Sequence, residues 1–174
     1  MKYNLVGYGS LIHPDDWPST CNRCYLVKIK GYERNCDHKT VNQKDVENNK
    51  GVFNIKNEKN SWINGILLEG ISEEDWRDIL YRERGYSMLE LNKNKIETYE
   101  SNYNLPDDEV KIFQGVRHME KPSSNWGYVQ RCLNGAKKFG DEFLRDFLNT
   151  TYVYKDGDKI ALNKIDKEEL ELEF

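Results

Sequence analysis

The 174-residue sequence predicts an α+β protein with a small mixed, mainly antiparallel sheet, either open or closed into a β-barrel, with flanking helices. Two observations support this prediction. Short segments rich in β-branched and aromatic residues recur through residues 2–116, and two helical apolar stripes follow one another between residues 126 and 148. Strands grouped ahead of paired helices are typical of α+β proteins. The length fits one domain, residues 1–174, with a core that needs no disulfides.

Four strands are predicted in the first 71 residues. The first, residues 2–8, ends in a turn of small residues and therefore delivers the chain to a tight loop. The second covers residues 25–32. The third and fourth, residues 51–55 and 63–71, flank the polar segment 56–61, whose composition is typical of a hairpin loop.

The clearest helix is predicted from Ser72 to about Arg84. The Ser72 hydroxyl can cap the first turn, and Asp75 can reach back to complete a capping box. Gly85 stands where a left-handed C-terminal cap is expected. The apolar residues fall at i, i+3 and i+4: Trp76, Ile79 and Leu80.

The remaining elements follow the same patterns. Strands are predicted at residues 86–91, 96–99 and 109–116. One helix runs from Trp126 towards Gly140, and a second follows a cap at Asp141. Residues 152–162 are predicted to form a hairpin around Asp156-Gly157, a favoured two-residue turn. The charged tail, residues 164–174, is expected to form a short helix or strand.

Composition excludes several classes of function. The 26 basic and 30 acidic side chains are dispersed and give a net charge of −4, so no surface for nucleic acid is expected. No run approaches the roughly 18 apolar residues of a membrane span, and no basic segment followed by an apolar leader opens the chain. We therefore expect a cytoplasmic protein that acts on a small molecule. No sequence pattern indicates an oligomeric state.

The four cysteines are Cys21, Cys24, Cys36 and Cys132, and we expect free thiols because no secretion signal accompanies them. Cys21 and Cys24, together with Cys36 and His38, offer four soft ligands that could hold zinc if the chain between the pairs folds back. The one-residue spacing of the second pair is unusual for zinc. The sequence therefore predicts no metal, with this set as the alternative.

Glu83 is the main candidate for chemistry. It lies 7 residues after Trp76 and 3 after Leu80, which places its carboxylate on the apolar stripe of its helix. Burial and the negative end of the helix dipole both disfavour the ionised form, so the pKa of Glu83 is predicted to rise. A glutamate tuned in this way can accept and return a proton. The alternative is a structural ion pair with a neighbouring arginine, although residues at i±1 point away from it.

A second candidate is the turn Tyr8-Gly9-Ser10-Leu11, which ends the first strand. Successive backbone N–H groups in such a turn can face one concavity and hold an anion such as a carboxylate. The alternative is ordinary turn chemistry. His13 directly after the turn is expected to be exposed, and Tyr128 is expected to be a core residue.

Together the two motifs resemble the gamma-glutamylcyclotransferase-like superfamily, and most closely its ChaC-like branch. The likeness rests on the strand ending in Tyr8-Gly9-Ser10-Leu11 and on Arg82-Glu83-Arg84-Gly85-Tyr86 after the helix. Three further segments agree, so that the resemblance spans nearly the whole chain: Gly31-Tyr32-Glu33-Arg34, Gly51-Val52-Phe53-Asn54-Ile55, and residues 128–151 with Gly135.

The resemblance implies a small mixed barrel with flanking helices and an enzyme that needs no cofactor or metal. It implies that the backbone amides of Tyr8, Gly9, Ser10 and Leu11 bind a γ-glutamyl group and that Glu83 is the catalytic acid/base. The substrate would be a small γ-glutamyl amide or peptide, with glutathione as one candidate, and the product 5-oxoproline. The ChaC-like branch commonly has an Arg-Arg pair at this position. This sequence keeps one arginine of the pair, Arg34, and has Glu33 in place of the other. A γ-glutamylamine substrate and a non-catalytic metabolite-binding module are the alternatives.

Overall fold

The computed structural model describes residues 1–41 and 43–172. The strands are β1 (Tyr3–Gly7), β2 (Arg23–His38), β3 (Lys50–Ile71), β4 (Tyr86–Glu90), β5 (Ile96–Thr98), β6 (Val110–Gly115), β7 (Ser123–Ser124), β8 (Thr151–Lys155) and β9 (Asp158–Ala161). The helices are α1 (Gln43–Glu47), α2 (Glu73–Arg82), α3 (Trp126–Lys137), α4 (Asp141–Asn149) and α5 (Lys167–Leu172). Four short 3-10 turns are η1 (Ser10–Ile12), η2 (Pro14–Asp16), η3 (Lys93–Lys95) and η4 (Leu162–Lys164).

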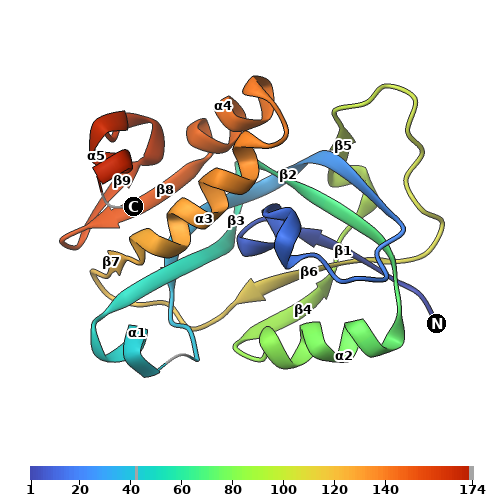
Figure 1. Cartoon of the computed structure of the whole chain (residues 1–174), viewed down its shortest axis with the longest axis horizontal. Coiled ribbons are helices and arrows are strands. Elements are labelled where there is room, and N and C mark those ends of the chain that lie inside the picture. Colours follow the sequence, from blue (N-terminus) through green and yellow to red (C-terminus); the bar gives the residue numbers. More distant parts are fainter. Residues whose placement is uncertain (42, 173–174) are drawn as a thin grey trace.

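The strands form one large mixed sheet, which confirms the α+β class. Its main path runs β4-β6-β1-β3-β2-β8-β9, with β5 added beside β2 and β7 beside β3. Most pairs are antiparallel, while β1 and β6, β2 and β8, and β3 and β7 are parallel. Within the described residues β4 and β9 end this path without meeting (Figure 1). The sheet is therefore open. The mixed, mainly antiparallel sheet with flanking helices is confirmed, and the term barrel describes it only loosely.

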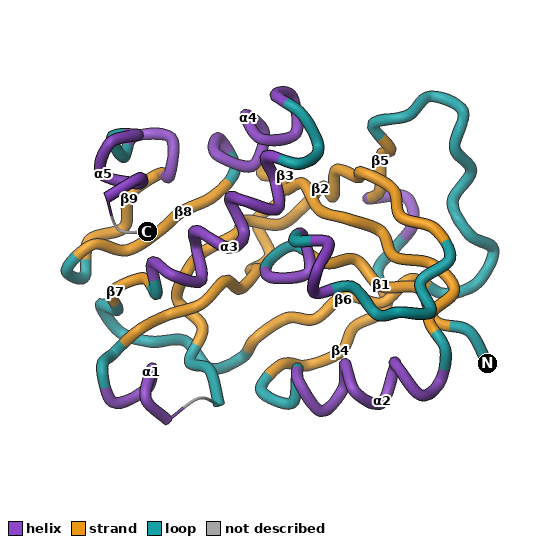
Figure 2. The backbone as a smooth tube through the Cα atoms, viewed as in Figure 1, coloured by secondary structure: helices purple, strands orange, loops and turns teal. Residues whose placement is uncertain are grey.

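Two long strands, β2 and β3, form the centre of the sheet (Figure 2). They pair from Arg23 opposite Glu69 to His38 opposite Val52. The polar segment 56–61, which the sequence predicts to be a loop, instead belongs to β3: Lys56 and Asn57 pair with β2, and residues 58–61 form an irregular stretch before the pairing resumes at Trp62. Its polar side chains are mostly accessible to solvent while its backbone remains in the sheet, and composition alone cannot separate this arrangement from a hairpin loop.

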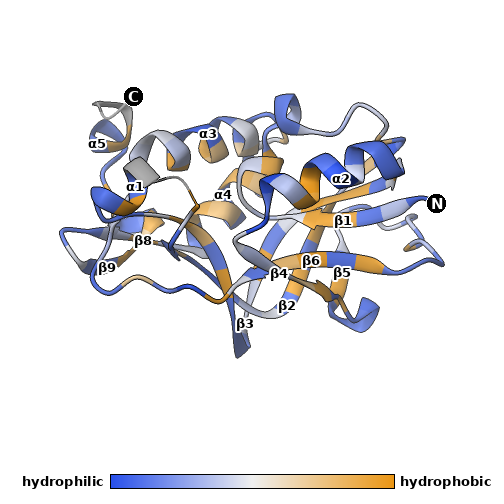
Figure 3. Cartoon of the chain, turned by 90° about the horizontal axis from the view of Figure 1, so that it is seen from below, coloured by the Kyte–Doolittle hydropathy of each residue, from blue (hydrophilic) through white to orange (hydrophobic). Residues whose placement is uncertain are grey.

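The core lies between the sheet and the helices that cover one side of it. In Figure 3, α2, α3 and α5 lie along the same side of the strands, and the hydrophobic residues of α2 and α3 turn towards the sheet. Phe143 and Phe147 of α4 are buried, as are Val129 and Leu133 of α3. No helix among residues 1–41 and 43–172 is long and apolar enough to cross a membrane.

Helix α2 begins as predicted and ends differently. The Ser72 side chain accepts a hydrogen bond from the Asp75 N–H, which confirms the N-terminal cap. The Asp75 carboxylate does not reach back. Its Oδ2 accepts hydrogen bonds from the N–H and hydroxyl of Thr20, at 2.8 and 2.6 Å. The helix ends at Arg82 with Glu83 as its C-cap, and Gly85 does not adopt the left-handed conformation that was expected.

The C-terminal elements agree with the sequence in outline. Asp156 and Gly157 have φ of 49° and 85°, as expected of the two-residue turn between β8 and β9. Asp141 is the first residue of α4 rather than its cap, because Gly140 occupies the N-cap position with φ of 93°. The tail forms the short helix α5; residues 173–174 lie outside the described part.

The four soft ligands considered for zinc do not come together. Cys21 and Cys24 lie at the start of β2, whereas Cys36 and His38 lie at its far end. A strand rises by roughly 3.3 Å per residue, so Cys24 and Cys36 are separated by about 40 Å along the strand. All four cysteines are free thiols, and no cluster of metal-binding side chains occurs in the described part of the chain.

His38 makes the stability of this fold dependent on pH. Its imidazole is fully buried 4.0 Å from the ring of Tyr86, centroid to centroid. Neither ring nitrogen has a hydrogen-bond partner among the described residues. Burial, assisted by the charges of Arg117 and His118, lowers the pKa of His38 from 6.5 to about 4.

Acid is therefore expected to destabilise the protein through His38. The unfolded chain binds a proton there below pH 6.5, and the folded chain only near pH 4. The stabilisation is complete above pH 6.5 and is lost as the pH falls through 4, by a total of about 3 kcal/mol. Urea unfolding between pH 7.5 and 4 measures this loss. His38→Phe should weaken the acid dependence by that amount, and an unchanged dependence would contradict the assignment.

Candidate active site

A cavity opens between the C-terminal end of β1, strands β3 and β6, the end of α2 and the start of α3. The centre of a water-sized sphere can occupy about 40 Å³ inside this cavity. One water needs roughly 10–15 Å³ by the same measure, so the cavity is larger than a single water site. A compact polar group fits, and a larger ligand must extend through the mouth. The lining residues are Val6, Gly7, Tyr8, Gly9, Ser10, Leu11, Phe53, Glu83, Tyr86, Phe113 and Tyr128.

Strand β1 places the loop Tyr8–Leu11 on one wall. The strand is held on both sides, with Val6 opposite Leu67 of β3 and opposite Ile112 of β6. The loop then tightens into η1, in which Ile12 N–H donates to the Gly9 carbonyl at 3.0 Å. Within the described residues the N–H groups of Gly9, Ser10 and Leu11 donate no turn, loop or side-chain hydrogen bond. These groups can donate to a ligand.

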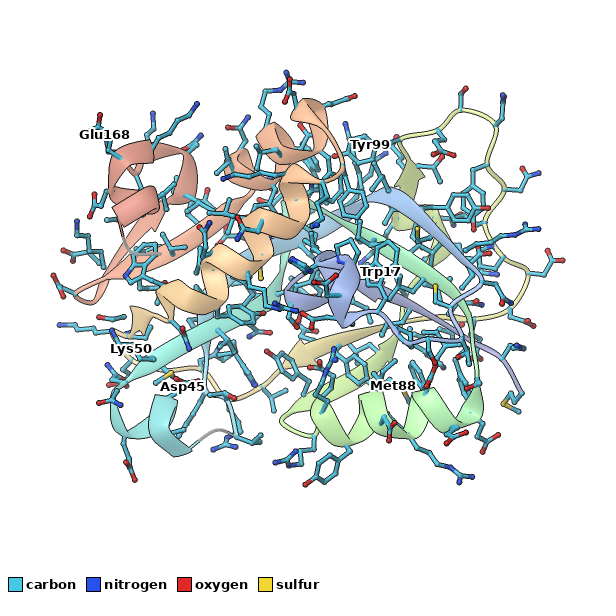
Figure 4. All side chains as sticks on the ribbon, viewed as in Figure 1. Trp17, Asp45, Lys50, Met88, Tyr99 and Glu168 are labelled. Atoms are coloured by element: carbon cyan, nitrogen blue, oxygen red, sulfur yellow. The ribbon has the colours of Figure 1, made fainter. Side chains whose placement is uncertain are left out.

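The loop is fixed by contacts from behind. The Trp17 indole donates to the Leu11 carbonyl at 2.7 Å, and Trp17 lies beside η1 in Figure 4. Gly135 of α3 lets the loop approach this helix closely, because a Cβ at Gly135 would lie 2.7 Å from the His13 N and Cα atoms. At Gly9, likewise, an added Cβ would lie 2.4 Å from the Tyr128 hydroxyl oxygen. Space therefore requires glycine at Gly135, where the contacts are with backbone, whereas at Gly9 a larger residue would have to displace the Tyr128 side chain.

Glu83 lines the same cavity as this loop. Its position as C-cap of α2 turns the side chain inward, where 17% of it is exposed. Burial raises the pKa of Glu83 above the usual 4.5, while Arg82, whose Nε lies 3.6 Å from Glu83 Oε1, partly offsets the rise. The rise agrees with the sequence argument. The contact with Arg82 corrects the expectation that the adjacent arginines point away.

The other walls are aromatic rings whose hydroxyls are occupied. The Tyr8 hydroxyl donates to the Phe113 carbonyl at 2.5 Å, and the Tyr86 hydroxyl donates to the Phe53 carbonyl at 2.8 Å. Burial raises the pKa of both tyrosines well above 10, so they stay protonated donors. Their rings exclude water from the space beside Glu83, which strengthens electrostatic interactions within it.

The structure brings all five residues predicted for the site to one cavity, and their roles stay predictions. Leu80, which served to place Glu83 on a buried stripe, is 38% exposed, and the buried face is formed by Trp76 and Ile79. His13 is buried, contrary to expectation, and does not line the cavity. Sequence reasoning assigned Tyr128 to the core. Phe53 and Tyr86 were named only within segments of the resemblance and Phe113 not at all. None of the three was assigned to the site, because long-range pairing brings them there.

Comparison with known proteins adds to this geometry. No protein-family model matches the sequence, and neither does any curated protein. Among solved structures, a gamma-glutamyl cyclotransferase matches with a TM-score of 0.63 at 13% identity, over 98% of this chain and 96% of its own. YkqA from Bacillus subtilis matches with a TM-score of 0.62 at 14% identity, over 83% of this chain and 52% of its own.

A third structure, a gamma-glutamyl cyclotransferase specific to glutathione from yeast, matches with a TM-score of 0.55 at 15% identity, over 96% of this chain and 98% of its own. This chain has the gamma-glutamyl cyclotransferase fold. Identities this low establish the fold and not the substrate. In this gamma-glutamyl cyclotransferase fold the loop after β1 and the end of α2 both line the cavity described above.

Proposed function

We propose that the chain, as a single domain of residues 1–174, is a gamma-glutamyl cyclotransferase that converts a γ-glutamyl amide into 5-oxoproline and a free amine. The observation that carries the proposal is that Glu83 and the Tyr8–Leu11 loop line one and the same cavity. The resemblance in sequence and the shared fold support it. The direct test is release of 5-oxoproline from γ-glutamyl compounds.

The loop orients the substrate in this mechanism. Its N–H groups hold the α-carboxylate of the γ-glutamyl group, and the α-amine then faces Glu83. The nucleophile and the γ-carbonyl belong to the same molecule, so closing the five-membered ring is a matter of orientation more than of activation. The aromatic walls restrict the bound chain to a folded conformation in which the amine reaches the carbonyl carbon.

Glu83 transfers the proton. Its carboxylate removes a proton from the α-ammonium group, and the amine nitrogen then forms the new C–N bond with the γ-carbonyl carbon. As the tetrahedral intermediate collapses, the bond to the leaving nitrogen breaks and that nitrogen receives the proton from the Glu83 carboxylic acid. The regenerated Glu83 carboxylate then takes the second proton from the ring nitrogen and passes it to solvent, which leaves the neutral lactam. A carboxyl group whose pKa is raised by burial serves both steps, because its carboxylate is a stronger base than an ordinary glutamate and its acid form can return the proton.

Two classes of leaving amine are compatible with the proposal. The cavity holds one compact group, so the leaving amine extends through its mouth. Glutathione is one candidate, since a yeast enzyme with this fold is described as specific to glutathione. A γ-glutamylamine is the other. A panel of γ-glutamyl amides with charged and neutral leaving amines, assayed for 5-oxoproline, separates the two.

The pH dependence of this activity is expected to report on Glu83 and Arg82. The rate constant kcat/KM should fall as the pH drops through the raised pKa of Glu83, because the base becomes protonated. Arg82 lowers that pKa, so Arg82→Gln should move the acidic limb of the profile to higher pH. Initial rates between pH 4 and 9 measure the shift.

Arg77→Gln is the matched control, since Arg77 lies on the same helix and pairs with the exposed Glu73. It should leave the acidic limb in place. A profile that moves equally in both variants, or in neither, would contradict the assignment of Glu83 as the base.

A further inference from the structure

Arg34 is a cation held entirely inside the protein, directly behind the loop. It lies on β2, its side chain is fully buried, and its guanidinium carbon lies 4.2 Å from the centre of the Phe147 ring. It donates five hydrogen bonds of 2.8–3.0 Å, to the Thr151 and Thr150 hydroxyls, the Tyr8 and Asn64 carbonyls and the Asn64 side-chain oxygen.

All five acceptors are neutral. Among the described residues Arg34 forms no ion pair, although the surface lysines and arginines find several. Burying a charge without a counter-charge is costly, and hydrogen bonds to neutral groups offset the cost only in part. A neutral side chain could fill the same space. The buried positive charge of Arg34 would therefore be stabilised by a negative group that the protein itself does not supply.

The contact with Tyr8 connects this charge to the cavity. Arg34 Nη1 lies 3.0 Å from the Tyr8 carbonyl oxygen, which belongs to the same peptide unit as the Gly9 N–H. In a trans peptide the C=O and N–H point in opposite directions, so the Gly9 N–H points away from Arg34. A hydrogen bond to the carbonyl polarises the peptide and strengthens its N–H as a donor.

We infer that Arg34 is a positioning residue whose charge gives the Tyr8–Leu11 loop its affinity for a carboxylate. It acts through the Tyr8–Gly9 peptide and selects ligands whose head group carries a negative charge at the loop. Glu83 lines the same cavity and, when ionised, supplies a negative charge, so the site can match a zwitterionic amino-acid head group. The inference deepens the proposed function and rests on it for the identity of the ligand.

A purely structural role for Arg34 leads to a different expectation. If the side chain only ties β2 to the loop and to α4, its loss weakens the binding of charged and neutral ligands alike. If its charge acts on the ligand, its loss weakens binding of the charged ligand alone. The ratio of two affinities therefore separates the alternatives, because general damage to the fold cancels in the ratio.

The test uses 5-oxoproline and its neutral carboxamide as probes, with dissociation constants measured by calorimetry or NMR titration. We expect the wild-type protein to prefer the carboxylate roughly tenfold or more, as is typical for a charge-assisted contact. Arg34→Lys should keep most of that preference, whereas Arg34→Met should bring the ratio close to one. Thr151→Val removes one hydrogen bond from Arg34 and keeps the charge, so its ratio should match wild type.

Each outcome decides the question. Equal affinities in wild type, or an unchanged preference in Arg34→Met, would overturn the inference. Arg34→Gln, which keeps a donor for the Tyr8 carbonyl without the charge, replaces the Met variant if that protein does not fold. Because binding is measured without turnover, a protein that keeps the preference but releases no 5-oxoproline would refute the proposed function and leave this inference standing.

Discussion

Glu83→Gln is expected to lower 5-oxoproline release by about 10²- to 10⁴-fold, the range typical of a lost general acid/base. The amide has nearly the shape of the carboxyl group but cannot take a proton from the α-ammonium group or return one to the leaving amine. Glu83 lines the cavity together with the loop, and no other ionisable carboxyl group is among the described lining residues. Steady-state assays with a γ-glutamyl amide at saturating concentration measure the loss in kcat.

The variant should remain folded. Burial already opposes ionisation of Glu83, so a neutral amide does not destabilise the site. Glu74→Gln on the exposed face of the same helix is the matched control, and it should retain wild-type activity and unfolding behaviour. Equal activity in Glu83→Gln and Glu74→Gln would remove Glu83 from the mechanism.

Gly135→Ala is expected to have the second-largest effect. Alanine is favoured over glycine inside a helix by about 1 kcal/mol, so the exchange would stabilise an unobstructed helix. Here the new Cβ would lie 2.7 Å from two backbone atoms of His13 and 2.9 Å from the Ile12 carbonyl carbon. These are backbone atoms of the segment that carries the loop, and relieving such overpacking typically costs about 1–3 kcal/mol. We expect lower stability together with a rise in KM.

Gly127→Ala is the control for helix propensity. It lies in the same helix α3, and a Cβ there meets only the Asn125 side chain, at an ordinary 3.6 Å. It should be neutral or stabilising, with unchanged KM. Thermal unfolding and kinetics of the pair measure the difference, and similar behaviour of the two variants would show that the loop does not depend on close packing at Gly135.

Local signals in the sequence were sufficient for several elements. Ser72 marks the start of α2, and Asp156-Gly157 marks the turn between β8 and β9, because each acts through backbone geometry within a few residues. The continuity of strand β3 could not be predicted from such local signals. Lys56 and Asn57 pair with β2 residues more than 20 positions earlier in the chain, and residues 58–61 remain in β3 as an irregular segment between paired stretches.

The same distinction applies to the site. The small-residue turn after β1 and the glutamate at the end of α2 carry local patterns and were found. Phe53, Tyr86 and Phe113 come from three different strands and meet only through the order of the sheet. Arg34 shows the limit most clearly. In the sequence it lies just beyond the predicted strand 25–32 and was noted only within the resemblance, and only the structure reveals that its charge is buried beneath the loop.

Identification of the product tests the central claim most directly. The wild-type protein is incubated with a panel of γ-glutamyl amides, including glutathione and γ-glutamylamines, and the products are resolved by mass spectrometry. Intramolecular attack predicts 5-oxoproline and the free amine in equal amounts, without glutamate. Release of glutamate, which requires attack by water, or binding of these compounds without any turnover, would contradict the assignment as a gamma-glutamyl cyclotransferase.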